Sequence, residues 1–469
     1  MSNSATPTPT RSVSPRAAVF AAGHLGELTW QIPVELVDAV LVDTNATERR
    51  LRMLPSRVGV YFVLALCLFP GVGYATVWAK LTAAIPDRIR VSVKAFRDLR
   101  RRVGAAPLRA LFEVLAGPVA VPSTPGVRFG RYRTVAFDGC VSIKVPDSDR
   151  NRFWLGKLKA SLGVTGYPVV RLMTVVETGT RALLGALFGP TATGEIDYAR
   201  ALLPLLDPDM LVLADRGFDA AEFLTDLART GAQFLIRLRI TRRLPALARL
   251  DDGSYLSCLG ALTVRIITAE VTVTCADGTR YTASYRLATT LCDPRRYPAA
   301  TLIALYHERW DHEIAYLALR HTLGQGRVLR STDPAGIEQE MWALLTVYQA
   351  LRRAMVTAVE SRPGIDPDRA SFTTALHTAK DLLVASQTIS DPTDLVGHIG
   401  RAVLTDLLPP RRPRTSVRKV KSPLSRYNKK DPYRPDRSTP ITSLTTTIIA
   451  PHPKNTTHQP TSLTTTHGP

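Results

Sequence analysis

The sequence predicts an α/β fold in which a mixed sheet is flanked by helices. One observation is a run of three apolar, β-prone segments, with a Gly-Thr turn at residues 179–180 between the second and the third. Another is that amphipathic and apolar segments then alternate, as helices and strands of α/β proteins do. In chain order the predicted elements are strands at 134–138, 169–178 and 181–188, a helix at 195–206, a strand at 210–215, a helix at 220–230 and a strand at 233–239.

This order of three meandering strands followed by alternating helix and strand is the one found in ribonuclease-H-like folds. Helical patterns lie on both sides of it, and β-branched segments at 263–274 and 280–289 predict a β-rich insertion. The expected organisation is a disordered 1–16, a helical N-terminal domain at 17–120, the first part of the core at 121–240, the insertion at 241–298, a helical second part of the core at 299–408 and a disordered tail at 409–469, basic and then rich in Thr and Pro.

The net charge of the chain indicates a polyanionic partner. It is +20 at pH 7, with a sequence pI near 10.1. Nucleic acid matches such an excess better than a membrane surface does, although an unrelated basic enzyme is an alternative. Residues 411–437 alone hold eleven Lys or Arg against two Asp, which suits nonspecific phosphate binding.

Two further features predict a cytoplasmic protein, associated with the nucleoid and not with a membrane. Residues 1–16 lack the apolar core of a secretory signal, and the five cysteines are scattered, as in reduced intracellular proteins. The uncharged stretch 58–79 is about as long as a membrane span, but Pro70 and Gly71 interrupt it. We therefore expect two buried helices joined by a turn there.

A basic helix predicted at 93–103 is a candidate for DNA contact, which makes 17–120 a candidate DNA-binding domain. Arg97 and Arg101 lie on adjacent turns, and the apolar side of the helix includes Val93 and Phe96. A solvated helix face explains the same pattern equally well, so this segment alone leaves both interpretations open.

Asp138 and Asp215 each follow an apolar, β-prone segment, at the expected carboxyl end of a strand. Either one alone is weak evidence, because polar residues and Asp-Gly turns commonly follow buried strands. If the two strands are neighbours in the sheet, however, the carboxylates emerge side by side. Two adjacent carboxylates repel each other unless a cation joins them.

A third acid lies on a helix predicted around residues 306–320. At 100° per residue, Tyr306, Arg309, Glu313 and Arg320 fall on one narrow stripe. Such a stripe is not a core stripe, and it places an acid beside groups suited to phosphate and base contact. A solvent-exposed ladder of ion pairs is the alternative.

The motifs V-A-F-D-G at Asp138, L-A-D-R-G-F at Asp215 and Y-x2-R-x3-E-x6-[K/R] from Tyr306 resemble those of bacterial insertion-sequence transposases of the insertion-sequence-four group. The resemblance runs from about residue 25 to 430. It implies that Asp138, Asp215 and Glu313 are the catalytic triad and that Tyr306, Arg309 and position 320 complete the signature. Arg320 stands where the group usually has Lys, and its guanidinium geometry differs.

Three carboxylates suit two divalent ions, Mg²⁺ or Mn²⁺, and our hypothesis makes Asp138 the shared ligand. Arg309 and Arg320 are expected to clamp phosphate, and Arg216 and Trp310 are weaker candidates for DNA contact. The resemblance further implies cut-and-paste movement of an element, with its terminal repeats and target DNA as partners and a homodimer in the synapse. A ribonuclease-H-like nuclease or resolvase, or a catalytically inert DNA-binding protein, remain alternatives.

Overall fold

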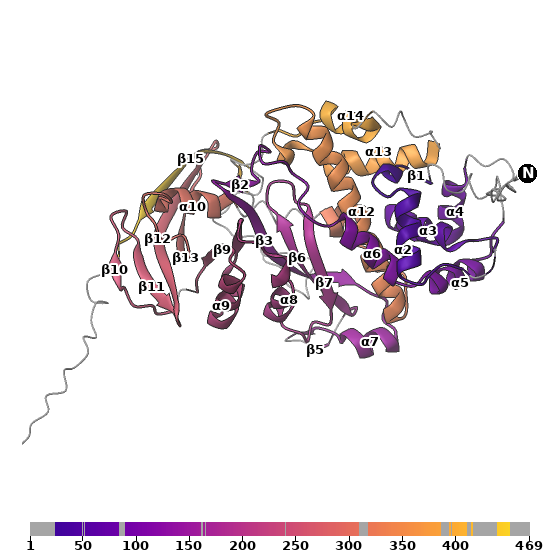
Figure 1. Cartoon of the computed structure of the whole chain (residues 1–469), viewed down its shortest axis with the longest axis horizontal. Helices are drawn as coiled ribbons and strands as arrows, with labels where there is room; N and C mark the ends of the chain where they lie inside the picture. The colour runs from indigo at the N-terminus through magenta and orange to yellow at the C-terminus, as the bar shows by residue number, and fades with distance from the viewer. Residues whose placement is uncertain are drawn as a thin grey trace, which may run out of the picture.

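The described residues of the computed structural model are 24–48, 50, 52–83, 90–160, 163–164, 166–239, 241–308, 318–385, 394, 396–409, 414–415 and 439–450. The predicted disorder at 1–16 lies outside these ranges. One large mixed sheet runs through the middle of the molecule, and helices pack on its two faces and at one end (Figure 1).

The main path of this sheet has the strand order β10-β11-β12-β13-β9-β8-β3-β6-β7. Its strands are β3 (Tyr132–Lys144), β6 (Val169–Glu177), β7 (Leu183–Gly189), β8 (Met210–Ala214), β9 (Gln233–Arg237), β10 (Ala248–Arg249), β11 (Tyr255–Leu259), β12 (Leu262–Cys275) and β13 (Arg280–Thr289). The short strands β2 (Arg128–Phe129) and β14 (Arg414–Thr415) join the sheet beside this path, and β4 (Lys159–Ala160) and β5 (Gly163–Val164) form a separate pair.

The five-stranded part β7-β6-β3-β8-β9 has the topology predicted from the sequence. β3, β6 and β7 form an antiparallel meander, whereas β8 and β9 run parallel to β3 and are reached through helical connections. This is the ribonuclease-H-like arrangement of three meandering strands extended by two parallel ones, so the predicted fold is confirmed.

The predicted end of the first strand at Asp138 is wrong, because β3 continues to Lys144. Beyond Asp138 its strand partner among the described residues is β6, with Asp138 opposite Thr174 and Gly139 opposite Met173. Its pairing with β8 stops at Ala136. The strand therefore passes through the Asp-Gly pair without turning, because a partner strand distant in sequence supplies its hydrogen bonds.

Different helices cover the two faces of the core sheet. One face is buried by the helices that connect the strands, with Phe223 among the residues in contact. These helices are α8 (Glu195–Ala201), its extension η2 (Leu203–Leu205) and α9 (Ala221–Arg229). Helix α10 (Ala299–Glu308) packs on the opposite face of β8 and β9. Figure 1 shows α8 and α9 below the strands and α10 above them, next to β15.

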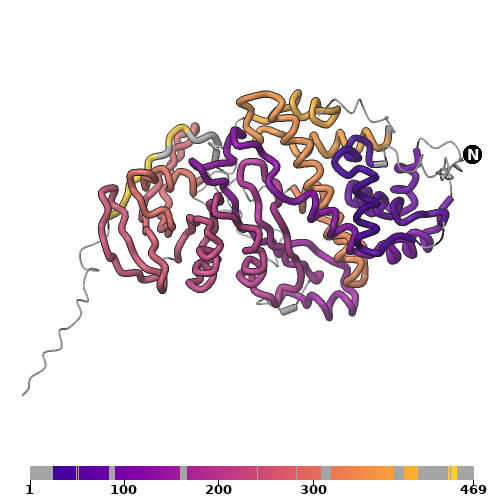
Figure 2. The backbone as a smooth tube through the Cα atoms, in the orientation of Figure 1, coloured from indigo at the N-terminus to yellow at the C-terminus, as the bar shows by residue number. Residues whose placement is uncertain are grey.

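The N-terminal helices do not form a separate body, because they share one hydrophobic core with the helices that follow the sheet. The long α12 (Pro334–Glu360) runs through this core, and the early and late parts of the chain lie side by side around it (Figure 2). The other elements of this region are β1 (His24–Glu27), η1 (Leu28–Trp30), α2 (Val34–Asp43), α3 (Ser56–Leu68), α4 (Tyr74–Leu81), α5 (Val93–Val103), α6 (Ala106–Leu115), η6 (Pro367–Arg369), α13 (Phe372–Ala385) and α14 (Gly397–Thr405), with α7 (Asp149–Leu155) below them.

The uncharged stretch 58–79 forms two helices, α3 and α4, on either side of Pro70 and Gly71, as predicted. Nearly all of α3 is buried, which explains its lack of charge without a bilayer. Among the helices that the structure describes, none has the length and apolar character needed to cross a membrane.

The β-rich insertion and the tail both belong to the sheet. β13 pairs with β9, so β10–β13 continue the core sheet. The predicted disorder of the tail is wrong at Thr439–Ile448, which forms strand β15. This strand runs antiparallel to residues 269–275 of β12, on the edge that β11 leaves uncovered. Threonine-rich sequence suits a strand once a partner edge is available.

Removing residues 439–469 is expected to make the protein self-associate. The deletion uncovers the edge of β12 along 269–275, where Val271 and Val273 are buried, and an uncovered edge pairs with other chains. Sedimentation velocity would measure the change. Deleting only 451–469 leaves β15 in place and is the matched control, and equal behaviour of the two truncations would contradict a covering role for β15.

Candidate active site

The two predicted aspartates lie side by side because of the register between β3 and β8. Arg133–Ala136 pairs in parallel, residue for residue, with Met210–Leu213. Two residues further along both strands, this register brings Asp138 next to Asp215. Neighbouring strands are about 4.8 Å apart. The prediction that the two carboxylates emerge at neighbouring positions is therefore supported by the strand pairing.

Both side chains project from the sheet face that α10 covers. Alternation along β3 places Asp138 on the same side as Ala136, and the extended backbone of Asp215 continues the side of Leu211 and Leu213. These apolar neighbours contribute to the core beneath α10. The helix on this face, α10, ends at Glu308, five residues before the third predicted acid in the sequence.

Local backbone hydrogen bonds fix the orientation of both carboxylates. Asp215 caps the short helix η3 (Arg216–Phe218), and its Oδ1 accepts a hydrogen bond from the backbone N–H of Gly217 at 2.7 Å. Oδ1 of Asp138 accepts one from the N–H of Gly139 at 3.0 Å. Both side chains are half-buried. Each aspartate is therefore held in place by the backbone that follows it, with its side chain partly exposed.

Tyr306 does not have the DNA-contacting position predicted from the helical stripe. It is fully buried, its hydroxyl donates to the carbonyl oxygen of Ala214 at 3.1 Å, and its ring packs edge-on against Tyr285. The helix buries this face against the sheet, so the stripe is not a solvent-exposed surface at Tyr306. The hydrogen bond ties α10 to the last residue of β8, directly before Asp215.

Tyr306→Phe is expected to lower the free energy of unfolding by about 1 kcal/mol and to leave DNA affinity unchanged, because it removes one buried hydrogen bond. Chemical denaturation and fluorescence anisotropy with labelled DNA would measure the two quantities. Arg216→Ala, at an exposed position beside Asp215, is the comparison expected to weaken DNA binding. Weaker DNA binding by Tyr306→Phe at unchanged stability would contradict the buried role.

Three of the predicted site residues, Arg309, Trp310 and Glu313, lie outside the described residues. α10 ends at Glu308, and the chain is described again from the π-helical segment η5 (Ala318–Leu323). Residue positions in a π-helix do not follow the 100° spacing, so the predicted angle of Arg320 does not apply. Within the described residues, no group of three His, Cys, Asp or Glu side chains is arranged to hold a metal ion.

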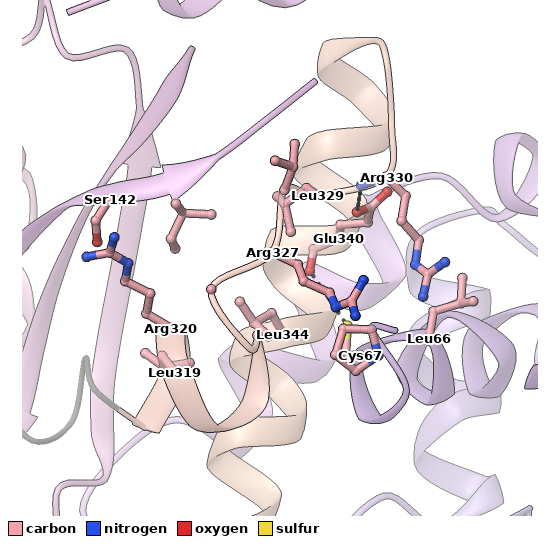
Figure 3. A pocket seen from close by; sticks show the side chains of 15 residues that line it. Leu66, Cys67, Ser142, Leu319, Arg320, Arg327, Leu329, Arg330, Glu340 and Leu344 are labelled. Atoms are coloured by element: carbon pink, nitrogen blue, oxygen red, sulfur yellow. Dashed lines mark hydrogen bonds between the residues drawn. The ribbon is translucent and has the colours of Figure 1, made fainter. Parts of the chain in front are cut away.

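Arg320 lines a pocket of about 60 Å³ together with Arg327 and Arg330. Figure 3 shows Arg320 reaching toward Ser142, on the part of β3 beyond Asp138. Its guanidinium groups give this side of β3 a positive charge.

The remaining basic candidates are on the surface. Arg216 is exposed in η3, beside Asp215. Arg97 and Arg101 are exposed on α5, as either prediction for this helix required, whereas Arg100 between them is buried. Val93, predicted on the apolar side, is largely exposed because it begins the helix.

A further acidic residue, Glu195, lies at this end of the sheet and was not predicted. It begins α8, after Gly194. Burial raises the pKa of its carboxyl; the charge of Arg171 opposes this rise and that of Asp215 adds to it. The only sequence signal is an acid in the first turn of the helix preceding the strand of Asp215, a common feature of helix N-termini.

A ribonuclease-H-like sheet with two acidic side chains in register on its central parallel strands defines a class of enzymes that act on phosphodiester bonds with divalent metal ions. The model for the "Transposase DDE domain" matches residues 130–350, and that for the "Insertion element 4 transposase N-terminal" matches residues 22–113. The chain belongs to the DDE transposases of the IS4 group and is a DNA transposase, an enzyme that cuts and transfers DNA.

Two relatives agree with this assignment. The chain is 25% identical over 405 residues to the transposase InsG for insertion sequence element IS4 of Escherichia coli (strain K12), across 82% of this chain and 90% of that protein. It is 28% identical over 222 residues to the putative transposase InsZ of the same strain, across 46% and 70%. A solved structure of the piggyBac transposase synaptic complex with hairpin DNA aligns with 82% of this chain and 85% of its own, at 10% identity and a TM-score of 0.40.

Proposed function

We propose that this transposase moves an insertion sequence by a cut-and-paste reaction in which Asp138, Asp215 and Glu313 hold two divalent ions, Mg²⁺ or Mn²⁺. The register that aligns Asp138 with Asp215 is the observation that carries the proposal. Carboxylate oxygens are the ligands these ions prefer, and two adjacent carboxylates need a positive charge between them. Family membership supports dependence on divalent metal.

Each acid has a separate structural support. Asp138 stands on the central strand, between β6 and β8, and is the proposed shared ligand. Asp215 is held by its cap on η3, and α10, which ends five residues before Glu313 in the sequence, packs on the same face of the sheet. When bound, the two ions activate the attacking oxygen and stabilise the leaving oxygen of an in-line displacement.

The reaction consists of in-line displacements of two kinds, which differ in the attacking oxygen and occur on both strands. In the first, the oxygen of a water molecule attacks phosphorus at the element's end, and the 3′-oxygen leaves as a hydroxyl group. In the second, that 3′-hydroxyl attacks another phosphodiester and displaces its 3′-oxygen. The phosphate must be held in line both times, a role we assign to Arg309 and Arg320.

The proposed partners are the element's terminal repeats and target DNA. Exposed Arg97, Arg101 and Arg216 contribute to a basic surface for phosphate contact, and Trp310 is proposed to contact a base. Joining two ends in one reaction favours a homodimer in the synapse. Such an enzyme works at the nucleoid.

The test uses the full chain and a plasmid carrying the element's own terminal repeats, with Mg²⁺ or with EDTA. We expect excision and joining to a target plasmid with Mg²⁺ and neither reaction with EDTA. Cleavage without joining would refute strand transfer and favour a nuclease or resolvase. DNA binding without cleavage would refute the catalytic proposal, and full activity in EDTA would refute its metal dependence.

A further inference from the structure

Glu195 places its carboxylate where a side chain on Gly139, the residue after Asp138, would lie, and close to Gly217, two residues after Asp215. A Cβ atom at Gly139 would overlap Oε1 of Glu195. A Cβ atom at Gly217 would lie 2.8 Å from Oδ1 of Asp215 and 3.8 Å from Oε2 of Glu195. The Glu195 carboxylate thus reaches from α8 past β3 to the backbone directly after Asp215.

This position is unfavourable for a carboxylate in the absence of a cation. The carboxylate is half-buried, and two charges act on it: Arg171 on β6 attracts it and Asp215 repels it. Adding a third negative charge beside the Asp138–Asp215 pair raises the electrostatic free energy of the site. A divalent cation held by the aspartates makes the Glu195 charge favourable, because each nearby carboxylate then strengthens the binding of the cation.

We propose that Glu195 is an additional acidic residue of the cation site, which strengthens the binding of the divalent ion from the α8 side of the sheet. This inference rests on the proposed metal-dependent function. Asp138 and Asp215 project toward α10, on the other face. Glu195 therefore acts on the ion through its charge beside Asp215, which makes it a positioning residue and not one of the three proposed ligands.

The first measurement is a titration of the metal-free full chain with Mn²⁺ in the absence of DNA, followed by electron paramagnetic resonance of the free ion. Glu195→Gln is expected to raise the dissociation constant about tenfold, as expected for removal of one charge several ångströms from a divalent ion. Glu195→Asp keeps the charge, and its dissociation constant is expected to lie between those of the wild type and Glu195→Gln. The matched control is Glu222→Gln on α9, where the wild-type side chain is 95% exposed. This substitution is expected to leave the dissociation constant unchanged.

The second measurement distinguishes this role from a structural ion pair with Arg171. In EDTA, Glu195→Gln is expected to melt at the same temperature as the wild type or higher, because the neutral amide removes the cost of burying a charge, which is the largest effect on this carboxyl. Addition of Mn²⁺ is also expected to raise the melting temperature of Glu195→Gln less than that of the wild type. A lower melting temperature in EDTA with an unchanged Mn²⁺ constant would overturn the proposal. If Glu195→Gln does not fold, Glu195→Asp takes its place. An unchanged Mn²⁺ dissociation constant and a lower melting temperature in that variant would also overturn the proposal.

Asp215→Asn in the same titration separates failure of this inference from failure of the proposed function. Weaker Mn²⁺ binding by Asp215→Asn but not by Glu195→Gln would refute the role of Glu195 and leave the metal-dependent function standing. Unchanged binding in both variants would refute the metal site itself.

Discussion

Asp138→Asn is expected to reduce both cleavage and strand transfer by at least about a thousandfold, or ~4 kcal/mol of transition-state stabilisation. The amide keeps the size of the side chain but removes the charge that the proposed metal site requires. The effect is expected to be large because Asp138 stands on the central strand, between β6 and β8, in register with Asp215. Rates would be measured on the terminal-repeat plasmid with Mg²⁺.

The same variant is expected to keep its fold and to bind DNA within about twofold of the wild-type affinity, because removing a negative charge does not weaken phosphate contacts. Asp209→Asn is the matched control: this carboxylate precedes β8 and is partly exposed in an ion pair with Arg128 at 3.6 Å. It is expected to leave the rates unchanged. Substantial strand transfer by Asp138→Asn would show that the catalytic carboxylates lie elsewhere.

The core of the fold was predictable because its strands and helices have strong local patterns. Apolar strands such as Met210–Ala214 and amphipathic helices such as Ala221–Arg229 differ clearly in periodicity. The order of these elements then restricts the topology to few possibilities. Asp138 and Asp215 come level with each other because β3 and β8 are parallel neighbours, and their pairing ends two residues before each aspartate.

What the sequence did not predict depends on partners distant in the chain. The extension of β3 past Asp138 depends on β6, and strand β15 forms only against the edge of β12. Burial of Tyr306 depends on Tyr285, which comes from the insertion. Glu195 comes close to the site through Gly139, which leaves space for its carboxylate. None of these contacts has a local pattern.

The same limit applies to the basic helix α5, where three neighbouring arginines have different roles. Arg97 and Arg101 are exposed. Arg100, only 7% exposed, forms an ion pair with Glu340 of α12 at 2.9 Å and donates to Gln339 Oε1 at 2.9 Å. Burial opposes its charge, but Glu340 and Tyr74 more than offset this and keep the pKa of Arg100 above its usual value.

Arg100→Ala is expected to destabilise the protein by about 3–5 kcal/mol, because it leaves the 6% exposed carboxylate of Glu340 buried without its cation. Arg101→Ala is the matched control on the same helix. Its side chain is 77% exposed, and its ion pair with Asp98 spans 3.7 Å, so a loss of at most about 1 kcal/mol is expected. Unfolding in urea would measure both variants.

A joint replacement, Arg100→Met with Glu340→Leu, tests the physical reason for this loss. Removing both charges avoids the unpaired carboxylate, so the double variant is expected to be more stable than Arg100→Ala. If Arg100→Ala costs as little as Arg101→Ala, water reaches Glu340 and the contact between α5 and α12 is loose. A large loss that the double variant restores would mean that the contact between α5 and α12 is closely packed and excludes water. Arg97 and Arg101 would then be presented to DNA by the same rigid helical core that borders the catalytic sheet, and not by a detachable N-terminal domain.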